Sequence, residues 1–300
     1  MIDQTNILIT GSHRSGSTWT GKMIALSNET GYVHEPMNHR MTTMNPPFDH
    51  WFDYVDTELS DGPHLKRLLD YMNVVSTQSF KSFFRRLGYC RKPRSVAKLV
   101  REYLSNRNRN RLVIKDPIAI FQAEWFYKTL NTKNVVLIRH PAAFISSLKN
   151  VDFRFDFDHF TKQPLLMERF KDYESEINEI RGRESTIVEQ GIILWNLFHD
   201  KILEYQTKYE KEWYFIKYED LATDPVLEFE KIYSYLSIPY SEEVRNEIAR
   251  NTSVIHSGGI KGQKTSNTKK WRSLLSDQEI ASIKAGTASV CSHFYSESDW

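Results

Sequence analysis

The sequence of 300 residues predicts an α/β protein of three layers, in which a central, mainly parallel β-sheet is flanked by helices. Two observations lead to this fold class. Three short apolar runs, each typical of a buried strand, end in charged residues or proline and are separated by stretches of helical pattern. A further apolar run, Ile7–Ile9, precedes these three and is followed at once by a loop of small residues and the start of a helix. The length and apolar content predict one domain over residues 1–300.

The first predicted elements are a strand at Ile7–Ile9, a loop at Gly11–Thr18 and a helix at Trp19–Leu26. Backbone N–H groups converge where such a loop meets a helix, so we expect the loop to bind a phosphate-like anion. The glycine spacing is nearly that of a Walker A loop, but Ser17 stands at the lysine position. This predicts a P-loop-type fold without the lysine on which a nucleotide triphosphatase depends. Arg14, inside the loop, can supply the missing positive charge.

The second strand is predicted from Gly31 to Pro36, and it carries Glu35 near its end. Ligands bind at the carboxyl ends of the strands in parallel α/β sheets, so we expect Glu35 beside the phosphate loop. The chain then becomes irregular and aromatic-rich before a helical region. We interpret residues 37–110, together with residues 151–185, as helical and loop insertions that shape an acceptor site.

A basic run extends from Lys81 to Arg111, with eleven Lys or Arg residues and one acid, Glu102. Such a run is typical of a solvated face. The alternative interpretation is a surface that steers an anionic cofactor or acceptor. The formal net charge of the whole chain is only +2, so a nucleic-acid partner is not indicated.

Two more apolar runs, residues 111–114 and 134–138, end in Lys115 and Arg139. Three strands that end in polar groups and alternate with helices indicate a site at one edge of a parallel sheet. The helices that follow the second and third of these strands are predicted over residues 118–130 and 142–149.

The C-terminal half continues the pattern less clearly. The aromatic stretch of residues 151–160 fits either an edge strand or an acceptor wall in a loop. Residues 212–217 predict a further strand, and residues 251–271 predict a loop rich in Gly, Ser and Lys. Helices are predicted over residues 184–210, 225–236 and 276–285, the last with an N-terminal capping box of Ser276 and Glu279.

Cys90 and Cys291 lie far apart and form neither a disulfide framework nor a metal-binding pattern. No window approaches the roughly 18 apolar residues of a membrane span. The N-terminus lacks the basic start of a signal peptide. These observations predict a soluble, cytoplasmic protein without a metal ion; its oligomeric state cannot be inferred.

Four stretches carry a resemblance to a known family. They are Arg14-Ser15-Gly16-Ser17-Thr18 with Trp19; Arg139 with Ser147 eight residues later; Tyr218-Glu219-Asp220-Leu221 with Asp224-Pro225; and Lys261-Gly262-Gln263-Lys264. In this order they resemble the sulfotransferase superfamily, which uses 3'-phosphoadenosine 5'-phosphosulfate as donor. The first is similar to its 5'-phosphosulfate motif, the second to its 3'-phosphate motif, and the fourth to its closing loop, with Gln263 where the family has arginine.

The resemblance implies transfer of a sulfuryl group to an acceptor hydroxyl, without a metal. It implies that Arg14 and the loop residues Ser15 to Thr18 bind the phosphosulfate and that Trp19 stacks on adenine. The implied partners of the 3'-phosphate are Arg139, Ser147, Lys261, Gly262 and Lys264, with Ser146 as the alternative to Ser147. The implied catalytic residues are Glu35 as general base, Lys115 as the group that stabilises developing charge, and Arg14.

Two short motifs bear on the acceptor. His34-Glu35-Pro36 is similar to a motif of Golgi carbohydrate sulfotransferases, whereas Lys115-Asp116-Pro117 is similar to one of the tyrosylprotein branch. We expect a carbohydrate or glycolipid acceptor, with a phenol or a peptide tyrosine as the alternative. His13, His34 and His140 lie within the motifs and are alternative candidates for the base.

Two other functions compete with this one. A P-loop nucleotide kinase or ATPase would need magnesium and is disfavoured by Ser17. A non-catalytic protein that binds polyanions through residues 81–111 would bind them with strong salt sensitivity. Ordinary structural roles also compete: Glu35 and Arg139 in ion pairs, Lys115 paired with Asp116, Ser147 on a helix face and Trp19 in the core.

Overall fold

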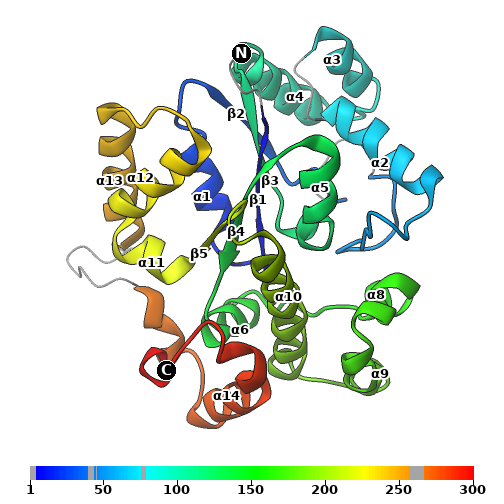
Figure 1. Cartoon of the computed structure of the whole chain (residues 1–300), viewed down its shortest axis with the longest axis vertical. Coiled ribbons are helices and arrows are strands. Elements are labelled where there is room, and N and C mark those ends of the chain that lie inside the picture. Colours follow the sequence, from blue (N-terminus) through cyan, green and yellow to red (C-terminus); the bar gives the residue numbers. More distant parts are fainter. Residues whose placement is uncertain (1–4, 40–43, 45, 76–78, 257–266) are drawn as a thin grey trace.

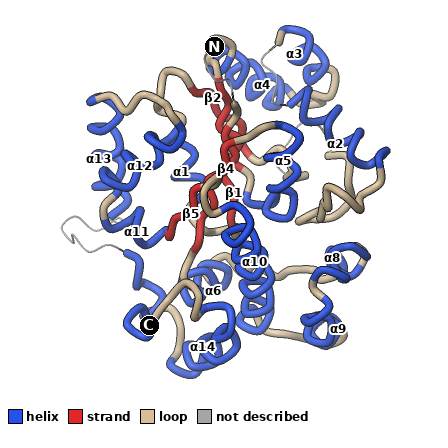
Figure 2. Tube along the Cα trace, viewed as in Figure 1, coloured by secondary structure: helices blue, strands red, loops and turns tan. Residues whose placement is uncertain are grey.

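The fold is seen in a computed structural model that describes residues 5–39, 44, 46–75, 79–256 and 267–300. Its described strands form one five-stranded sheet in the order β2-β3-β1-β4-β5, and every neighbouring pair is parallel. The strands are β1 (Ile7–Gly11), β2 (Thr30–His34), β3 (Arg111–Lys115), β4 (Lys133–Ile138) and β5 (Tyr214–Lys217). Figures 1 and 2 show the sheet in the centre of the molecule with helices on both sides, as the alternating pattern predicted.

Helices on one face of the sheet cover an apolar cluster that includes Ile7, Ile9 and Val135. These helices are α1 (Ser17–Ile24), α11 (Tyr218–Thr223), α12 (Pro225–Leu236) and α13 (Glu242–His256). Val244 and Ile248 of α13 are buried four residues apart. That single pair was too short a signal to predict a helix. The expected loop over 251–271 is therefore wrong for residues 251–256, which belong to α13, and for residues 267–271, which belong to the 3-10 helix Asn267–Ser273.

The opposite face carries a larger apolar cluster, to which Leu8, Ile114 and Val136 contribute from the strands. The helices around it are α2 (Gly62–Val75), α5 (Ala123–Leu130), α6 (Pro141–Lys149), α10 (Ile187–Tyr209) and α14 (Asp277–Cys291). Strand side chains alternate between the two faces, which is why Ile7 and Leu8 belong to different clusters. Figure 1 shows α1, α12 and α13 on one side of the sheet and α5 and α10 on the other.

Two predicted helices differ from the structure, one at its start and the other at its end. The predicted helix over 118–130 begins as a 3-10 helix, Pro117–Gln122, before α5. Asp116 explains the tight start, because its side chain accepts the N–H of Ile118 at 3.0 Å. The helix over 276–285 extends to Cys291 and has the predicted capping box of Ser276 and Glu279.

The two insertions are mostly helical. The first contains α2, α3 (Phe80–Leu87) and α4 (Pro93–Asn106), and the second contains α7 (Asp158–Thr161), α8 (Pro164–Arg169) and α9 (Glu174–Arg181). Residues 151–157 form a loop and not an edge strand.

The edge of the sheet at β2 is covered by the Asn106 side chain, which pairs with both the N–H and the carbonyl of Tyr32, at 2.9 and 3.0 Å. The short 3-10 helices Lys171–Tyr173, Asn267–Ser273 and Glu297–Asp299 complete the described elements. No described helix is long and apolar enough to cross a membrane.

Candidate active site

The loop between β1 and α1 forms the floor of the candidate site. Gly16 precedes α1 with φ of 90°, a conformation that glycine adopts without strain. A Cβ atom there would lie 2.4 Å from Cδ2 of Tyr218, so the aromatic ring packs directly on the loop. The N–H groups of Ser17 and Thr18 lie in the first turn of α1 and have no acceptor within the helix. The loop therefore offers backbone donors and the positive end of a helix dipole.

Two arginines meet beside this loop. The Arg139 guanidinium donates to the carbonyl oxygen of Arg14 and lies 4.8 Å from the centre of the Tyr218 ring. Burial lowers the pKa of Arg14, and the charge of Arg139 lowers it further. Within the described part of the chain neither arginine forms an ion pair with a carboxylate. Two neighbouring cations without an acid create a strong local attraction for an anion.

Ser147 belongs to the same group. Its Oγ accepts a hydrogen bond of 2.9 Å from Nε of Arg14. Ser146 instead donates to the carbonyl of Ala143 at 3.1 Å and is buried. Of the two candidate serines, Ser147 is the one whose hydroxyl contacts the loop arginine.

Glu35 and Lys115 form an ion pair at the ends of β2 and β3. The register of these strands aligns His34 with Lys115, and the N–H of Glu35 donates to the Lys115 carbonyl at 2.8 Å. The Lys115 side chain is 0% exposed and that of Glu35 is 14% exposed, so only the carboxylate is open to a ligand. Nδ2 of Asn38 donates to the second carboxylate oxygen of Glu35 at 2.6 Å.

The surroundings of this pair determine its protonation. Burial alone would raise the pKa of Glu35, but the charge of Lys115 and hydrogen bonds from Lys115 and Asn38 outweigh it and hold the pKa below its usual value. Burial lowers the pKa of Lys115, and Glu35 opposes that effect. Burial also raises the pKa of the adjacent Asp116 to about 7. Glu35 is therefore the ionised carboxylate of this group at neutral pH.

Glu35, Arg14, Arg139 and Ser147 all line one open cleft with a volume of about 760 Å³. Apolar side chains of both insertions line the same cleft, through Trp51, Val151 and Phe153. The rings of Trp51 and Phe153 stack at 6.1 Å, with an angle of 28° between their planes. A cleft with this volume, an apolar wall and converging polar groups fits a small-molecule site. Of the phenylalanines in the stretch 151–160, Phe153 lines the cleft, whereas Phe155, Phe157 and Phe160 are buried.

Trp19 also lines the cleft, and its ring is half-buried against Phe229, 5.4 Å away between centroids. Ser17 and Thr18 line it as well, whereas Ser15 is fully buried behind the loop. The predicted closing loop with Lys261, Gly262 and Lys264 lies outside the described residues.

The three histidines differ in their surroundings. His13 is packed among the rings of Phe52, Phe144, Phe153 and Phe198, and burial lowers its pKa to about 3. His140 stacks on Trp271 behind the sheet edge, and burial lowers its pKa to about 3 as well. His34 is bonded to the Tyr32 hydroxyl at 3.2 Å, with its Nε2 4.0 Å from the Glu35 carboxylate. Glu35 lines the cleft and is paired with Lys115. None of the three histidines combines these two features.

Lys22, Asn38 and Tyr218 were not predicted as site residues. Lys22 lines the cleft one helical turn after Thr18, so the four-residue spacing on α1 was the signal that would have found it. Asn38 lies three residues after Glu35 in an irregular segment, where no periodic pattern applies. Tyr218 was part of a recognised motif, but its position on Gly16 depends on the tertiary fold.

Comparison with known proteins identifies one family. The sequence model described as Sulfotransferase domain matches residues 4–286. No curated protein sequence matches the chain. Two solved structures are similar to it in fold, each with a TM-score of 0.50. The sulfotransferase domain from the curacin biosynthetic pathway is 16% identical and covers 96% of each chain. The sulfotransferase domain from the Synechococcus PCC 7002 olefin synthase is 20% identical and covers 98% of this chain and 97% of its own.

Proposed function

Because the chain belongs to the sulfotransferase family, we propose that its cleft transfers a sulfuryl group from 3'-phosphoadenosine 5'-phosphosulfate to a hydroxyl of a carbohydrate or glycolipid. The observation that supports this most directly is the shared cleft. It combines two arginines that are not paired with acids and, beyond them, an ionised carboxylate that faces an apolar wall. The donor's anionic part fits the two arginines, and the hydroxyl of an acceptor fits the ionised carboxylate.

The residues present fit the donor. Arg139 lines the cleft, and its Nε is a buried polar atom for which the described structure supplies no hydrogen-bond partner. Such atoms are rare in folded proteins unless a ligand or water satisfies them. Arg14, Ser17 and Thr18 would hold the phosphosulfate with the loop amides, and Arg139 and Ser147 would hold the 3'-phosphate. Trp19 offers an aromatic face to the adenine, and Lys261, Gly262 and Lys264 complete the proposed donor site from outside the described residues.

The bound donor supplies the sulfuryl group and leaves as 3'-phosphoadenosine 5'-phosphate. Glu35 accepts the proton of the acceptor hydroxyl at its exposed carboxylate, which makes the oxygen a better nucleophile. Lys115 keeps this carboxylate ionised and places a positive charge beside the reacting oxygens, while Asn38 fixes its orientation. Arg14 and the loop amides counter the negative charge that develops on the leaving phosphate.

The acceptor is proposed from the aromatic wall that Trp51 and Phe153 contribute to the cleft. Their rings are stacked, and the polar groups of Asn38 and Lys22 line the same cleft. Sugars have one apolar face and a rim of hydroxyls, so this wall fits a sugar ring. The insertions that carry Trp51 and Phe153 would then set acceptor choice, while the sheet edge carries the chemistry.

The test is an activity screen of the full chain with labelled donor against neutral sugars, phenols and tyrosine peptides. We expect sugars to be sulfated, and Glu35→Gln to lower kcat about 10²- to 10⁴-fold with an unchanged Kd for 3'-phosphoadenosine 5'-phosphate. His34→Gln is the matched control, since it changes the neighbouring side chain only. Near wild-type turnover in Glu35→Gln would remove Glu35 as base, and transfer to phenols or peptides alone would remove the carbohydrate acceptor.

A further inference from the structure

A second cleft, with a volume of about 720 Å³, lies on the first insertion between α2, α3 and the start of α4. We call it the basic cleft. It shares no lining residue with the donor cleft. The residues relevant here are Arg67, Asp70, Tyr71, Arg85, Tyr89, Arg91 and Lys92.

The charges of the basic cleft are unbalanced. Four cations, Arg67, Arg85, Arg91 and Lys92, line it from three parts of the insertion, with Asp70 as the one acid in its lining. Among the described residues, none of the four cations forms an ion pair. Like charges that converge in a concave surface raise the local potential above that of a flat basic face. An anion with several oxygens would relieve this repulsion and could accept paired hydrogen bonds from the guanidinium groups.

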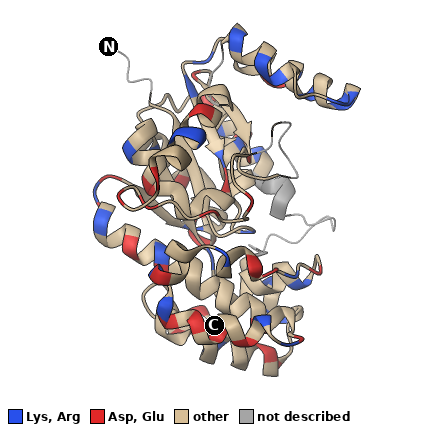
Figure 3. Ribbon diagram, turned by 90° about the vertical axis from the view of Figure 1, so that its right-hand side faces the viewer, with Lys and Arg blue, Asp and Glu red and all other residues tan. Residues whose placement is uncertain are grey.

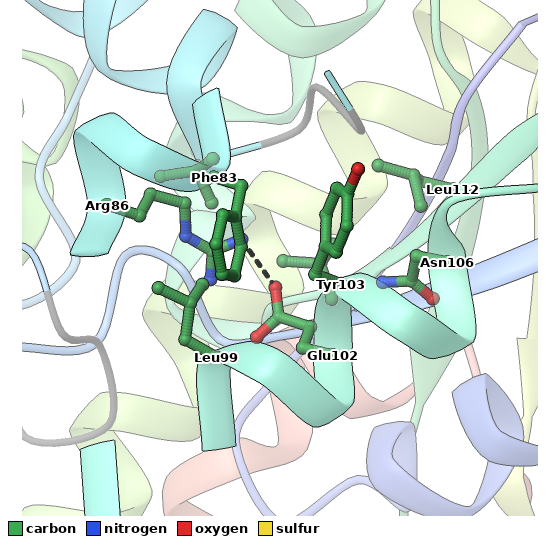
Figure 4. Close-up of a pocket in the computed structure, with 9 residues that line it drawn as sticks. Phe83, Arg86, Leu99, Glu102, Tyr103, Asn106 and Leu112 are labelled. Carbon is green, nitrogen blue, oxygen red and sulfur yellow. Dashed lines mark ion pairs between the residues drawn. The ribbon is translucent and has the colours of Figure 1, made fainter. Parts of the chain in front are cut away.

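The scaffold behind the basic cleft is firmly packed. Arg86, next to Arg85, points inward and pairs with Glu102 of α4 at 2.7 Å, and the rings of Phe83 and Tyr103 pack 4.7 Å apart (Figure 4). The space enclosed by these residues is about 20 Å³, room for one water molecule and no ligand. The hairpin of α3 and α4 is thus held together by these contacts, and none of the residues around the enclosed space lines the basic cleft.

Figure 3 shows Lys and Arg at intervals along helices at the top of the molecule, the level at which Figure 1 places α3 and α4. Many of these cations are ordinary solvated side chains. The basic cleft differs from them because it is concave and includes two tyrosines, of which Tyr89 is 50% exposed. Exposed tyrosine beside arginine can contact both the ring face and the anionic groups of a saccharide.

The basic cleft is connected to the catalytic carboxylate through the backbone. The Tyr71 hydroxyl donates to the carbonyl oxygen of Pro36 at 2.5 Å, and Pro36 directly follows Glu35. One residue of the basic cleft, Tyr71, is therefore hydrogen-bonded to the residue that follows the proposed base.

We propose that the basic cleft binds anionic groups, sulfate or carboxylate, of a saccharide acceptor, away from the hydroxyl that is sulfated. This rests on the proposed function, because it specifies the acceptor as an already anionic saccharide. The reacting sugar occupies the wall at Trp51 and Phe153, and the anionic part lies across Arg85 and Arg91.

The test measures binding of fluorescently labelled, sulfated maltotetraose to the full chain, with unsulfated maltotetraose as the neutral arm. The cleft variant is Arg85→Glu/Arg91→Glu. The matched control is Arg94→Glu/Arg101→Glu, which makes the same charge change at exposed positions outside the basic cleft. We expect Kd for the sulfated probe to rise about tenfold or more in the cleft variant and about twofold or less in the control, as loss of charge-assisted hydrogen bonds predicts.

Unchanged affinity for 3'-phosphoadenosine 5'-phosphate in both variants shows that they are folded and that the donor cleft is intact. Equal weakening in both variants would reduce the basic cleft to a diffuse basic surface and overturn the inference. Absence of wild-type binding to the sulfated probe would overturn it too, as would cleft-dependent binding to phosphatidylserine vesicles alone. If the chain transfers no sulfate but the probe binds through the basic cleft, the proposed function fails and the anion site stands.

Discussion

The Nε atom of Arg14 donates a hydrogen bond of 2.9 Å to Oγ of Ser147, although the two residues are 133 positions apart. Arg14 lies in the loop after β1 and Ser147 in α6 after β4, and these strands are neighbours in the sheet. The contact therefore joins the proposed 5'-phosphosulfate and 3'-phosphate sites into one surface.

This contact predicts unequal roles for two adjacent serines. Ser147→Ala should raise the Kd for 3'-phosphoadenosine 5'-phosphate about tenfold, as expected when a hydrogen bond to a charged partner is lost. Ser146→Ala is the control, because its hydroxyl bonds only to its own helix. Calorimetric titration checks both, and a larger effect of Ser146→Ala would assign the 3'-phosphate to that serine.

Gly16 should tolerate no side chain. A Cβ atom would lie 2.4 Å from the Tyr218 ring, and the φ of 90° is strained for other residues. Gly16→Ala is expected to lower the free energy of unfolding by about 1–3 kcal/mol, or to weaken nucleotide binding by the same free energy. Urea unfolding and titration with 3'-phosphoadenosine 5'-phosphate measure these. Gly62→Ala, where no atom lies within 4 Å of the added Cβ, should leave affinity unchanged; equal behaviour of the two variants would contradict the contact.

The ion pair of Lys115 with Glu35 predicts a shift in the pH profile. Lys115 holds the pKa of Glu35 below its ordinary value, against the effect of burial. A general base acts only when ionised, so wild-type kcat/KM should fall at acid pH, below pH 4.5. In Lys115→Met the effect of burial is opposed only by Asn38 and His34, so the pKa of Glu35 rises and the acid limb moves to higher pH.

The matched variant for this profile is Lys22→Met. Lys22 lines the same cleft but makes no hydrogen bond to Glu35, whose carboxylate is bonded to Lys115 and Asn38. The acid limb of Lys22→Met should stay near that of wild type. An unmoved limb in Lys115→Met would mean that the titrating base is not Glu35.

The raised pKa of Asp116 predicts that the stability of the protein depends on pH. Burial raises its pKa to about 7, from an ordinary value of 3.8. The folded state then holds this proton more tightly than the unfolded state, so the contribution of Asp116 to stability falls as pH rises from about 4 to about 7. Asp116→Asn cannot ionise and loses one of the two acceptors that bind the N–H groups of Met37 and Ile118.

Urea unfolding at about pH 5 and about pH 8 tests this. Asp116→Asn should be destabilised by about 1–3 kcal/mol at the lower pH, because one buried N–H loses its acceptor. The deficit should be smaller at the higher pH, where the wild type also bears the cost of a buried charge. An equal deficit at both pH values would show that the pKa of Asp116 is not raised.

Local sequence determined much of the donor side of the site. Glycine positions, small residues and the following helix identified the loop, because a strand–loop–helix turn has strong local requirements on φ and side-chain size. Apolar runs that end in Glu35, Lys115 and Arg139 placed these residues at one edge of a parallel sheet. The same local signals did not predict α13, where the apolar periodicity was short. They also did not predict the 3-10 helix Pro117–Gln122 before α5, because it depends on the Asp116 side chain that caps the turn.

Only the tertiary structure decided how these residues meet. The strand order β2-β3-β1-β4-β5 brings Glu35 beside Lys115 and Arg14 beside Ser147, and no local pattern specifies strand order. Burial decided which groups are open: the Lys115 ammonium is enclosed while the Glu35 carboxylate reaches the cleft. The sequence by itself therefore determined the fold class, the family resemblance and the chemical groups, because these depend on near neighbours in the chain. Contacts, exposure and pKa depend on packing between distant segments, and for that physical reason they became visible only in the folded chain.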